Sequence, residues 1–302
     1  MRNVALFSLI FSIGCTKSSA PETTAPAKAP EKSQVQVDPE PKVGPLVTLG
    51  GSITETVFAL GQGDKVVGVD VSSLYPLEAT KLPKVGYYRQ VSAEGVISLA
   101  PKMVIASASS GPKDVLEKIT NVGIRLESIP ATKTFAGAKA RIQAIAKLIG
   151  AEDKGNELIA KLDQQIQGVK KAETPKKVLF IYARGAGSLN VAGTKNAADE
   201  MIRLAGGVNA VSEYEGYKPI NSESIVAAAP DVILMTSRGL KSVGGAEAVA
   251  QLKGISLTPA AKNKAIIEVD DLLLLGFGPR TGEAVTDLAA KLSATANAEP
   301  KP

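Results

Sequence analysis

The chain has 302 residues, enough for two domains, and 44% of them are hydrophobic and 22% charged, an ordinary globular balance. Its formal net charge of +5 comes from lysines and arginines mixed with acids along the sequence, without a basic block, so the composition disfavours nucleic-acid binding. The absence of histidine excludes Ser-His and Cys-His catalytic pairs and histidine zinc sites, so an enzymatic role is not expected.

The first residues, 1–15, predict a lipoprotein signal peptide. Arg2 gives a short positive start, and the apolar stretch 4–13 is too short to span a bilayer but suits a signal peptide. The stretch leads into a small residue and Cys15, a pattern that resembles a bacterial lipobox with Ser12 where leucine is usual. We expect Cys15, the single cysteine, to be lipidated and to become the mature N-terminus. The alternative is an ordinary secreted protein with a cysteine in its leader.

Residues 16–45 predict a disordered linker. Six prolines lie among Ala, Ser, Thr, Lys and Glu, with no apolar periodicity, so this segment cannot bury enough surface to fold. It would hold the folded part away from the membrane that carries the anchor. A similar composition predicts a disordered tail at 294–302.

From residue 46 onward, short apolar strands alternate with helices, which predicts parallel sheets. The first lobe is expected to cover residues 46–150. Its predicted strands are 46–49, 65–69, 103–106 and 124–129, and its predicted helices follow Gly50-Gly51-Ser52 and cover 93–99 and 115–122.

Residues 134–171 have apolar positions at helical spacing, and Gly150 and Gly155 are the expected break between two helices. We expect the second part, 151–172, to be one long helix of about 20 residues and roughly 30 Å that connects the lobes. Pro175 then forces a restart, and residues 173–293 form the second lobe. Its predicted strands are 178–182, 232–235 and 265–269, and its predicted helices are 197–204, 246–252 and 283–292.

One internal repeat supports two similar lobes. Residues 92–105 align without a gap to residues 221–234, each with a polar N-cap, an acid in the first helical turn, an apolar face, a proline and a buried strand. The matched acids are Glu94 and Glu223. First-turn acids complement the helix dipole, and that alone would account for them. We therefore predict two Rossmann-like α/β lobes joined by one long rigid helix.

The segment Val85-Gly86-Tyr87-Tyr88-Arg89 is a candidate oxygen-ligand site. Ferric iron accepts phenolate, but a free tyrosine has a pKa of about 10 and needs a nearby cation to ionise at neutral pH. In an extended segment Arg89 would point to the same side as Tyr87 and favour its phenolate, while Tyr88 would point the other way. The alternative is that Tyr87 only packs in a cleft and Arg89 is solvated.

Two α/β lobes, one connecting helix, a lipid anchor and a matched glutamate pair resemble the class III periplasmic binding proteins of ABC importers, the class that serves cobalamin, siderophores and haem. Six stretches are similar to the haemin-binding component of haem importers: 50–55, 73–76, 82–89, 92–95, 192–194 and 275–280. The resemblance implies a monomer outside the cytoplasm, on the periplasmic or cell-surface side. It would bind ferric haem b and deliver it to an ABC permease, touching the membrane only through its anchor.

The resemblance also implies residue roles. Tyr87 matches the tyrosine of a Gly-Tyr-x-Arg motif that is an axial ligand of haem iron, with Arg89 stabilising it. Some members add a histidine or another group from the second lobe, and this chain has no histidine. Its iron would be five-coordinate, or completed by a non-histidine group or water. Glu94 and Glu223 match acids that form salt bridges with arginines of the permease.

Further residues are candidates for lining the haem cleft. Arg184 and Arg238 follow predicted strands, and in open parallel sheets ligands bind outside the carboxyl ends of the strands. They could pair with haem propionates or remain solvated loop cations. Tyr88, Tyr214 and Tyr217 could line the ring. The competing interpretation is a ferric-siderophore or cobalamin receptor of a related importer.

Overall fold

The computed structural model describes residues 43–185, 189–219 and 221–295. The predicted signal peptide with Cys15 lies outside the described residues, as do residues 16–42 of the predicted linker and 296–302 of the predicted tail. The predicted linker, residues 16–45, extends too far along the chain. Pro45 already belongs to the folded lobe, because its carbonyl accepts a hydrogen bond from the Lys102 amide at 2.8 Å. No helix within the described ranges is long and apolar enough to cross a membrane.

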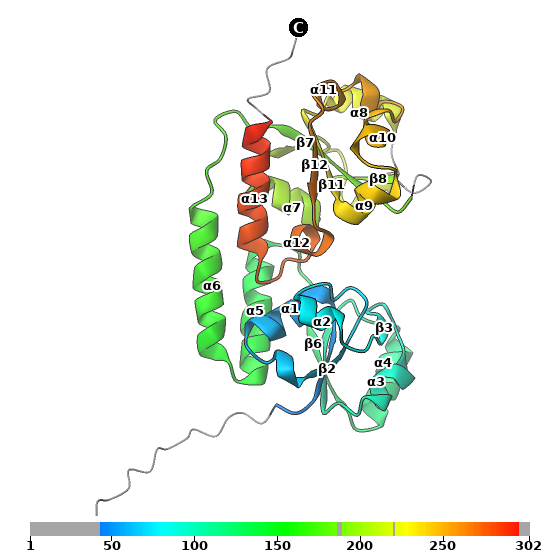
Figure 1. The fold of residues 1–302 in the computed structure, drawn as a ribbon, viewed down its shortest axis with the longest axis vertical. Helices are drawn as coiled ribbons and strands as arrows, with labels where there is room; N and C mark the ends of the chain where they lie inside the picture. Colours follow the sequence, from blue (N-terminus) through cyan, green and yellow to red (C-terminus); the bar gives the residue numbers. More distant parts are fainter. Residues whose placement is uncertain (1–42, 186–188, 220, 296–302) are drawn as a thin grey trace, which may run out of the picture. The chain divides into compact units, whose positions relative to one another are not determined.

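The first lobe is built on a four-stranded parallel sheet in the order β2-β1-β5-β6 (Figure 1). Strands β1 and β5 are almost completely buried because helices cover both faces of the sheet. Leu46 and Ile105 pack on the face that carries α1 and α5, while Val47 and Val104 pack on the face that carries α3 and α4. The strands are β1 (Leu46–Leu49), β2 (Val66–Val69), β5 (Met103–Ser107) and β6 (Arg125–Ile129).

Short elements complete this lobe beside the sheet. A small hairpin of two-residue strands lies between α2 and α3 in the chain, and it carries the tyrosine segment. The helices are α1 (Gly51–Ala59), η1 (Gly63–Lys65), α2 (Leu77–Thr80), α3 (Ala93–Ser98) and α4 (Lys113–Asn121), and the hairpin strands are β3 (Gly86–Tyr87) and β4 (Gln90–Val91).

The second lobe has a mixed sheet in the order β10-β8-β7-β11-β12, with β9 also paired to β7. The expectation of a parallel sheet holds for β7, β9, β11 and β12 but is wrong for β8 and β10. From the end of β7 to the start of β8 the chain is too short for the crossover that a parallel pair needs. The strands are β7 (Lys177–Ala183), β8 (Leu189–Ala192), β9 (Val208–Asn209), β10 (Tyr217–Pro219), β11 (Val232–Thr236) and β12 (Ile266–Val269).

Helices surround this sheet, and the last one packs into the core of the second lobe beside α7 and against α6 (Figure 1). They are α7 (Ala197–Leu204), α8 (Ser222–Ala228), α9 (Ser237–Ser242), α10 (Ala246–Ala250), η2 (Ile255–Leu257), α11 (Pro259–Lys262), α12 (Asp271–Leu275) and α13 (Thr281–Ala294). Helix α13 begins before the predicted residue 283 and runs to Ala294, the first residue of the predicted tail.

The internal repeat has the same structure in both lobes. Helices α3 and α8 each end in an alanine with a left-handed backbone, Ala100 with φ 44° and Ala229 with φ 43°. Each alanine is followed by a proline and then by a central strand, β5 or β11. An alanine in this conformation costs roughly 1–2 kcal/mol, so the same strained turn at matching positions indicates a shared helix-to-strand design.

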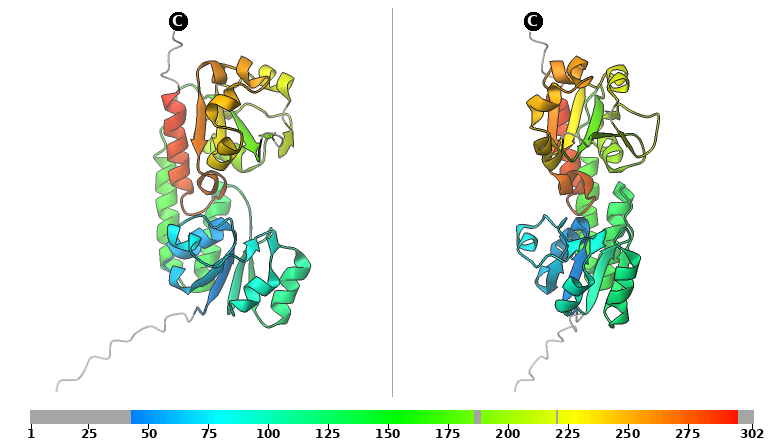
Figure 2. Two further views of the ribbon diagram at one scale, coloured as in Figure 1. Left: turned by 45° about the vertical axis from the view of Figure 1, so that its right-hand side comes forward. Right: turned by 90° about the vertical axis from the view of Figure 1, so that its right-hand side faces the viewer.

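The helical connection between the lobes is one helix, as expected, but it is shorter than predicted. Helix α5 (Phe135–Ile149) ends at Gly150, which is left-handed with φ 67°, as the glycine pattern predicts. Helix α6 (Glu152–Gln167) has 16 residues, or about 24 Å, shorter than expected. It packs against both α5 and α13, with α5 beside the part of α6 at the first lobe and α13 beside the part at the second lobe (Figure 1, Figure 2). One helix thus joins the lobes, and it is supported by a helix from each of them.

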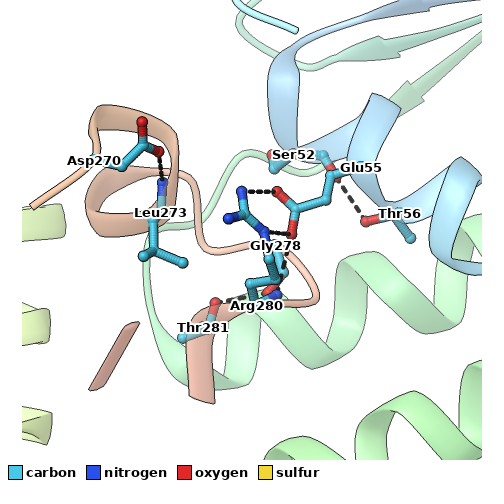
Figure 3. A network of polar contacts seen from close by, with 8 residues as sticks. All are labelled: Ser52, Glu55, Thr56, Asp270, Leu273, Gly278, Arg280 and Thr281. Atoms are coloured by element: carbon cyan, nitrogen blue, oxygen red, sulfur yellow. Dashed lines mark hydrogen bonds and ion pairs between the residues drawn. The ribbon is translucent and has the colours of Figure 1, made fainter. Parts of the chain in front are cut away.

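A buried ion pair fixes the first lobe to the segment between α12 and α13 (Figure 3). Arg280 contacts the Glu55 carboxylate through Nε and Nη2, each at 3.1 Å, and its guanidinium lies 3.5 Å from the ring centroid of Tyr75. Burial raises the pKa of Glu55 more than Arg280 lowers it. The pair therefore fixes the position of this segment rather than adding much net stability.

Candidate functional site

The tyrosine segment forms a tight hairpin. Tyr87 on β3 is opposite Gln90 on β4, so Tyr88 and Arg89 are the two turn residues. Gly86 has φ 97°, and a Cβ there would lie 2.7 Å from the Gln90 carbonyl oxygen, so the turn requires glycine. The expectation of an extended segment is wrong here. The Arg89 guanidinium lies 5.2 Å from the ring centroid of Tyr88, and the rings of Tyr87 and Tyr88 meet edge to face at 4.6 Å.

Asp70, which the sequence analysis did not single out, holds this hairpin in place. The carboxylate is buried and accepts backbone N–H bonds from Gly50 at 2.9 Å, Ser72 at 2.9 Å and Tyr88 at 3.3 Å. The Ser72 and Ser73 hydroxyls also donate to it. One carboxylate thus ties the turn after β1, the loop after β2 and the tyrosine hairpin. Its sequence signal is an acid directly after a buried apolar strand.

A cavity of about 440 Å³ lies between the lobes. The first lobe contributes side chains from the hairpin, and the second contributes side chains that follow β7 and β11 or lie on β10. This cavity brings together six of the seven predicted cleft residues: Tyr87, Tyr88, Arg89, Arg184, Tyr217 and Arg238.

Tyr182 also lines this cavity and was not predicted. Arg184 Nε donates to its hydroxyl at 2.9 Å, and the guanidinium lies 5.4 Å from its ring centroid. This hydrogen bond is the main cause of a raised pKa of Arg184, and Tyr87 adds to it through a smaller charge and hydrogen-bond effect. Arg184 therefore lies within reach of phenols from both lobes. The available signal was the spacing of Tyr182-Ala183-Arg184, which repeats that of Tyr87 and Arg89.

The surroundings of Tyr88 disfavour its charged form. Burial raises the pKa of Tyr88 to about 12, with a hydrogen bond and charge from Tyr87 adding to the effect. A phenol with this pKa keeps its proton at neutral pH. Tyr88 is therefore a poor source of phenolate.

The cavity is rich in cations. Among the described residues, its lining has four cationic side chains, Arg89, Lys133, Arg184 and Arg238, and one carboxylate, Asp271. The carboxylate accepts the Arg238 backbone N–H at 3.0 Å. A cleft with one sign of charge concentrates ligands of the opposite sign. This arrangement suits an anionic ligand.

Tyr214 does not belong to the cleft, and the expectation that it could line the haem ring is wrong. It lies instead beside a second cavity of about 620 Å³ within the second lobe, where its hydroxyl donates to the Val191 carbonyl at 3.1 Å. This cavity is larger but contains none of the other six predicted cleft residues. Its lining lacks the opposed tyrosines and the cation cluster of the smaller cavity.

Glu94 and Glu223 occupy the same position in the two lobes. Both are exposed in the first turns of α3 and α8, behind the N-cap residues Ser92 and Asn221. Neither carboxylate forms an ion pair with another described residue. Both are thus available to a partner outside the chain.

Comparison with known proteins gives consistent matches. The family model of periplasmic binding proteins matches residues 46–272. The chain is 32% identical over 265 residues to YvrC of Bacillus subtilis, named as an uncharacterized ABC transporter substrate-binding lipoprotein, covering 85% of this chain and 82% of that protein. It is 28% identical over 245 residues to the vitamin B12-binding protein of Vibrio parahaemolyticus, covering 80% and 87%.

A solved structure extends the similarity to the fold. The periplasmic heme-binding protein RhuT from Roseiflexus sp. RS-1, in its apo form, superimposes with a TM-score of 0.81 at 39% sequence identity. The match covers 84% of this chain and 99% of that chain. The two-lobed architecture is therefore shared with a heme-binding protein over nearly its whole length.

Proposed function

Because the chain belongs to the periplasmic binding protein family, the substrate-binding components of ABC transporters, we propose that it binds ferric haem between its lobes and delivers it to an ABC permease. The observation that carries this proposal is the interlobe cavity, in which tyrosines from both lobes lie among four cations. Phenolate suits ferric iron, and arginine or lysine suits carboxylates such as the haem propionates.

Tyr87 is the proposed axial ligand. Its support is its place in the cavity and the unsuitability of its neighbour Tyr88, whose pKa is raised to about 12 by burial. Arg184 takes the role first expected of Arg89, because it lies near the Tyr87 phenol while Arg89 lies over Tyr88. A guanidinium beside a phenol favours the phenolate form.

Tyr182 is the proposed non-histidine group on the opposite side of the cleft. It carries its own guanidinium partner, Arg184, at 2.9 Å and belongs to the other lobe. With no histidine in the chain, Tyr182, near the carboxyl end of β7, is a phenol of the second lobe that lines the cavity. A bound haem would separate Tyr87 and Tyr182, and Arg184 could remain with either phenol.

A haemin titration followed by absorbance tests the function, with Tyr87→Phe as the site variant. Tyr214→Phe is the matched control, because it removes a phenol from the other cavity. We expect a shifted Soret band in the wild type and the control, and at least a tenfold loss of affinity in Tyr87→Phe, about 1.4 kcal/mol. An unshifted Soret band in the wild type would reject haem and favour the cobalamin or siderophore alternative, which the vitamin B12-binding relatives keep open.

We also propose a location and a partner surface. The Cys15 thiol carries the lipid anchor, on the periplasmic or cell-surface side of the membrane, and the segment 16–42 tethers the folded lobes. Glu94 and Glu223 dock to arginines of a permease dimer, one glutamate from each lobe. Exposed charges of this kind set orientation and association rate more than affinity.

A further inference from the structure

A partly buried lysine in the cleft has no role of its own in the proposal above, which counts it only among the four cations. Lys133 lies in the segment that leads from β6 to α5, and its side chain lines the interlobe cavity. Its Nζ donates to the Gly276 carbonyl at 3.1 Å, and no described carboxylate pairs with it. An ammonium has three donors, so two N–H groups remain for a ligand in the cavity.

Hydrogen bonds from Arg141 fix the backbone on the N-terminal side of Lys133. Arg141 on α5 is 2% exposed, and its Nη2 donates to the carbonyls of Pro130 at 3.3 Å and Thr132 at 3.2 Å. Its Nη1 donates to the Phe277 carbonyl, next to the residue that Lys133 contacts. One buried guanidinium thus holds both segments that place the lysine at the cavity.

The surroundings of Lys133 disfavour its charged form in the free protein. Burial, together with the positive charges of Arg141 and Arg89, lowers its pKa to about 8. These are the charged groups that act on it from α5 and from the tyrosine hairpin. The pKa of Arg141 is itself lowered by burial to about 10, so Arg141 stays charged near pH 8 and does not titrate with the lysine.

We propose that Lys133 anchors a carboxylate of the bound ligand and takes up a proton from solvent as it does so, which couples binding to pH. This inference rests on the proposed function, with a haem propionate as the carboxylate. An anion beside the ammonium favours its charged form and offsets the repulsion from the two arginines. Lysine suits this role because its pKa shifts readily on burial, whereas arginine stays charged.

The sign of the pH dependence follows from the lysine. Below about pH 8 the lysine is already protonated, and ligand binding takes up only a small fraction of a proton there. Above that pH the free protein must gain a proton to bind, so affinity falls as pH rises. Phenolate formation at Tyr87 releases a proton and acts in the opposite direction. The contribution of the lysine is therefore the difference in proton uptake between the wild type and Lys133→Met, because the tyrosine is the same in both proteins.

The test is calorimetric titration with haemin at pH 6.5 and pH 9, each in two buffers of different ionisation enthalpy. At pH 9 we expect the wild type to take up nearly one proton more than Lys133→Met, and at pH 6.5 nearly the same number. Lys133→Met should bind haemin about tenfold more weakly at pH 7, and Lys133→Arg should restore affinity without the extra proton. Haemin dimethyl ester, whose carboxylates are blocked, should bind wild type and Lys133→Met alike.

Two results would overturn the role of Lys133 while the proposed function stands. The first is haemin binding with equal proton counts in wild type and Lys133→Met at pH 9. The second is an equal loss of affinity for haemin and its dimethyl ester, which would assign the lysine to packing. Failure of the wild type to bind haemin at all would instead reject the proposed function. Circular dichroism of each variant verifies that it is folded.

Discussion

At the scale of single residues, the sequence identified the types of group in the cleft but not all of their contacts. Tyr87 and Arg184 could be predicted because a Tyr-x-Arg spacing and a cation after a strand are visible in the sequence. The orientation of Arg89 could not, since a two-residue turn leaves no periodic signal and reverses the geometry of an extended segment. Lys133 was missed because its environment is made by segments far apart in the chain.

The carboxylate of Asp70 offers a prediction at this scale. Asp70→Ala leaves the backbone N–H groups of Gly50, Ser72 and Tyr88 without their acceptor. Unsatisfied buried donors are costly, so we expect the free energy of unfolding to fall by about 3 kcal/mol. Urea denaturation measures this loss, and haemin affinity should fall too because the tyrosine hairpin is released.

Asp114→Ala is the matched control. This aspartate is exposed on α4 and forms only a surface ion pair with Lys118 at 3.9 Å. Its removal should change stability by at most about 0.5 kcal/mol. An equal effect of the two substitutions would contradict the role of Asp70 as the acceptor that ties three loops together.

At the scale of elements, buried strands were the most predictable parts. The apolar runs that became β1, β5, β7 and β11 lie at the sheet centres, where burial on both faces makes the sequence continuously apolar. Strands β8 and β10 were missed because they are short and contain exposed or half-buried residues, and β10 lies at the edge of the sheet. The packing of α13 on α6 also escaped prediction, since a helical pattern reports which face is apolar but not what covers it.

The ion pair between α1 and the segment before α13 gives the element-scale prediction. Glu55→Leu or Arg280→Met alone leaves one buried charge without its partner, and each should cost about 3–5 kcal/mol. The double variant removes both charges, so its loss should be much smaller than the sum of the single losses. Urea denaturation of the wild type, the two single variants and the double variant gives the four unfolding free energies of this double-mutant cycle. Additive losses would mean that the two side chains act independently.

At the scale of the whole molecule, the repeat predicted two lobes of one design, and the structure has the same helix, strained alanine turn and central strand in each. This duplication places one exposed glutamate on each lobe, Glu94 and Glu223, in matching first turns. What the sequence could not supply is that neither glutamate forms an ion pair with another described residue, which depends on every neighbouring element.

A permease made of two similar subunits would require both glutamates at once, and that sets the last prediction. The double variant Glu94→Gln with Glu223→Gln should bind haemin with unchanged affinity, because neither residue lines the cavity. In vesicles that contain the cognate permease, its haem uptake should fall at least tenfold, since the charges that orient docking are gone. Glu117→Gln with Glu247→Gln, which also removes one exposed acid from each lobe, should transport normally. Equal uptake by both double variants would assign docking to another surface, whereas loss in both would show dependence on net charge alone.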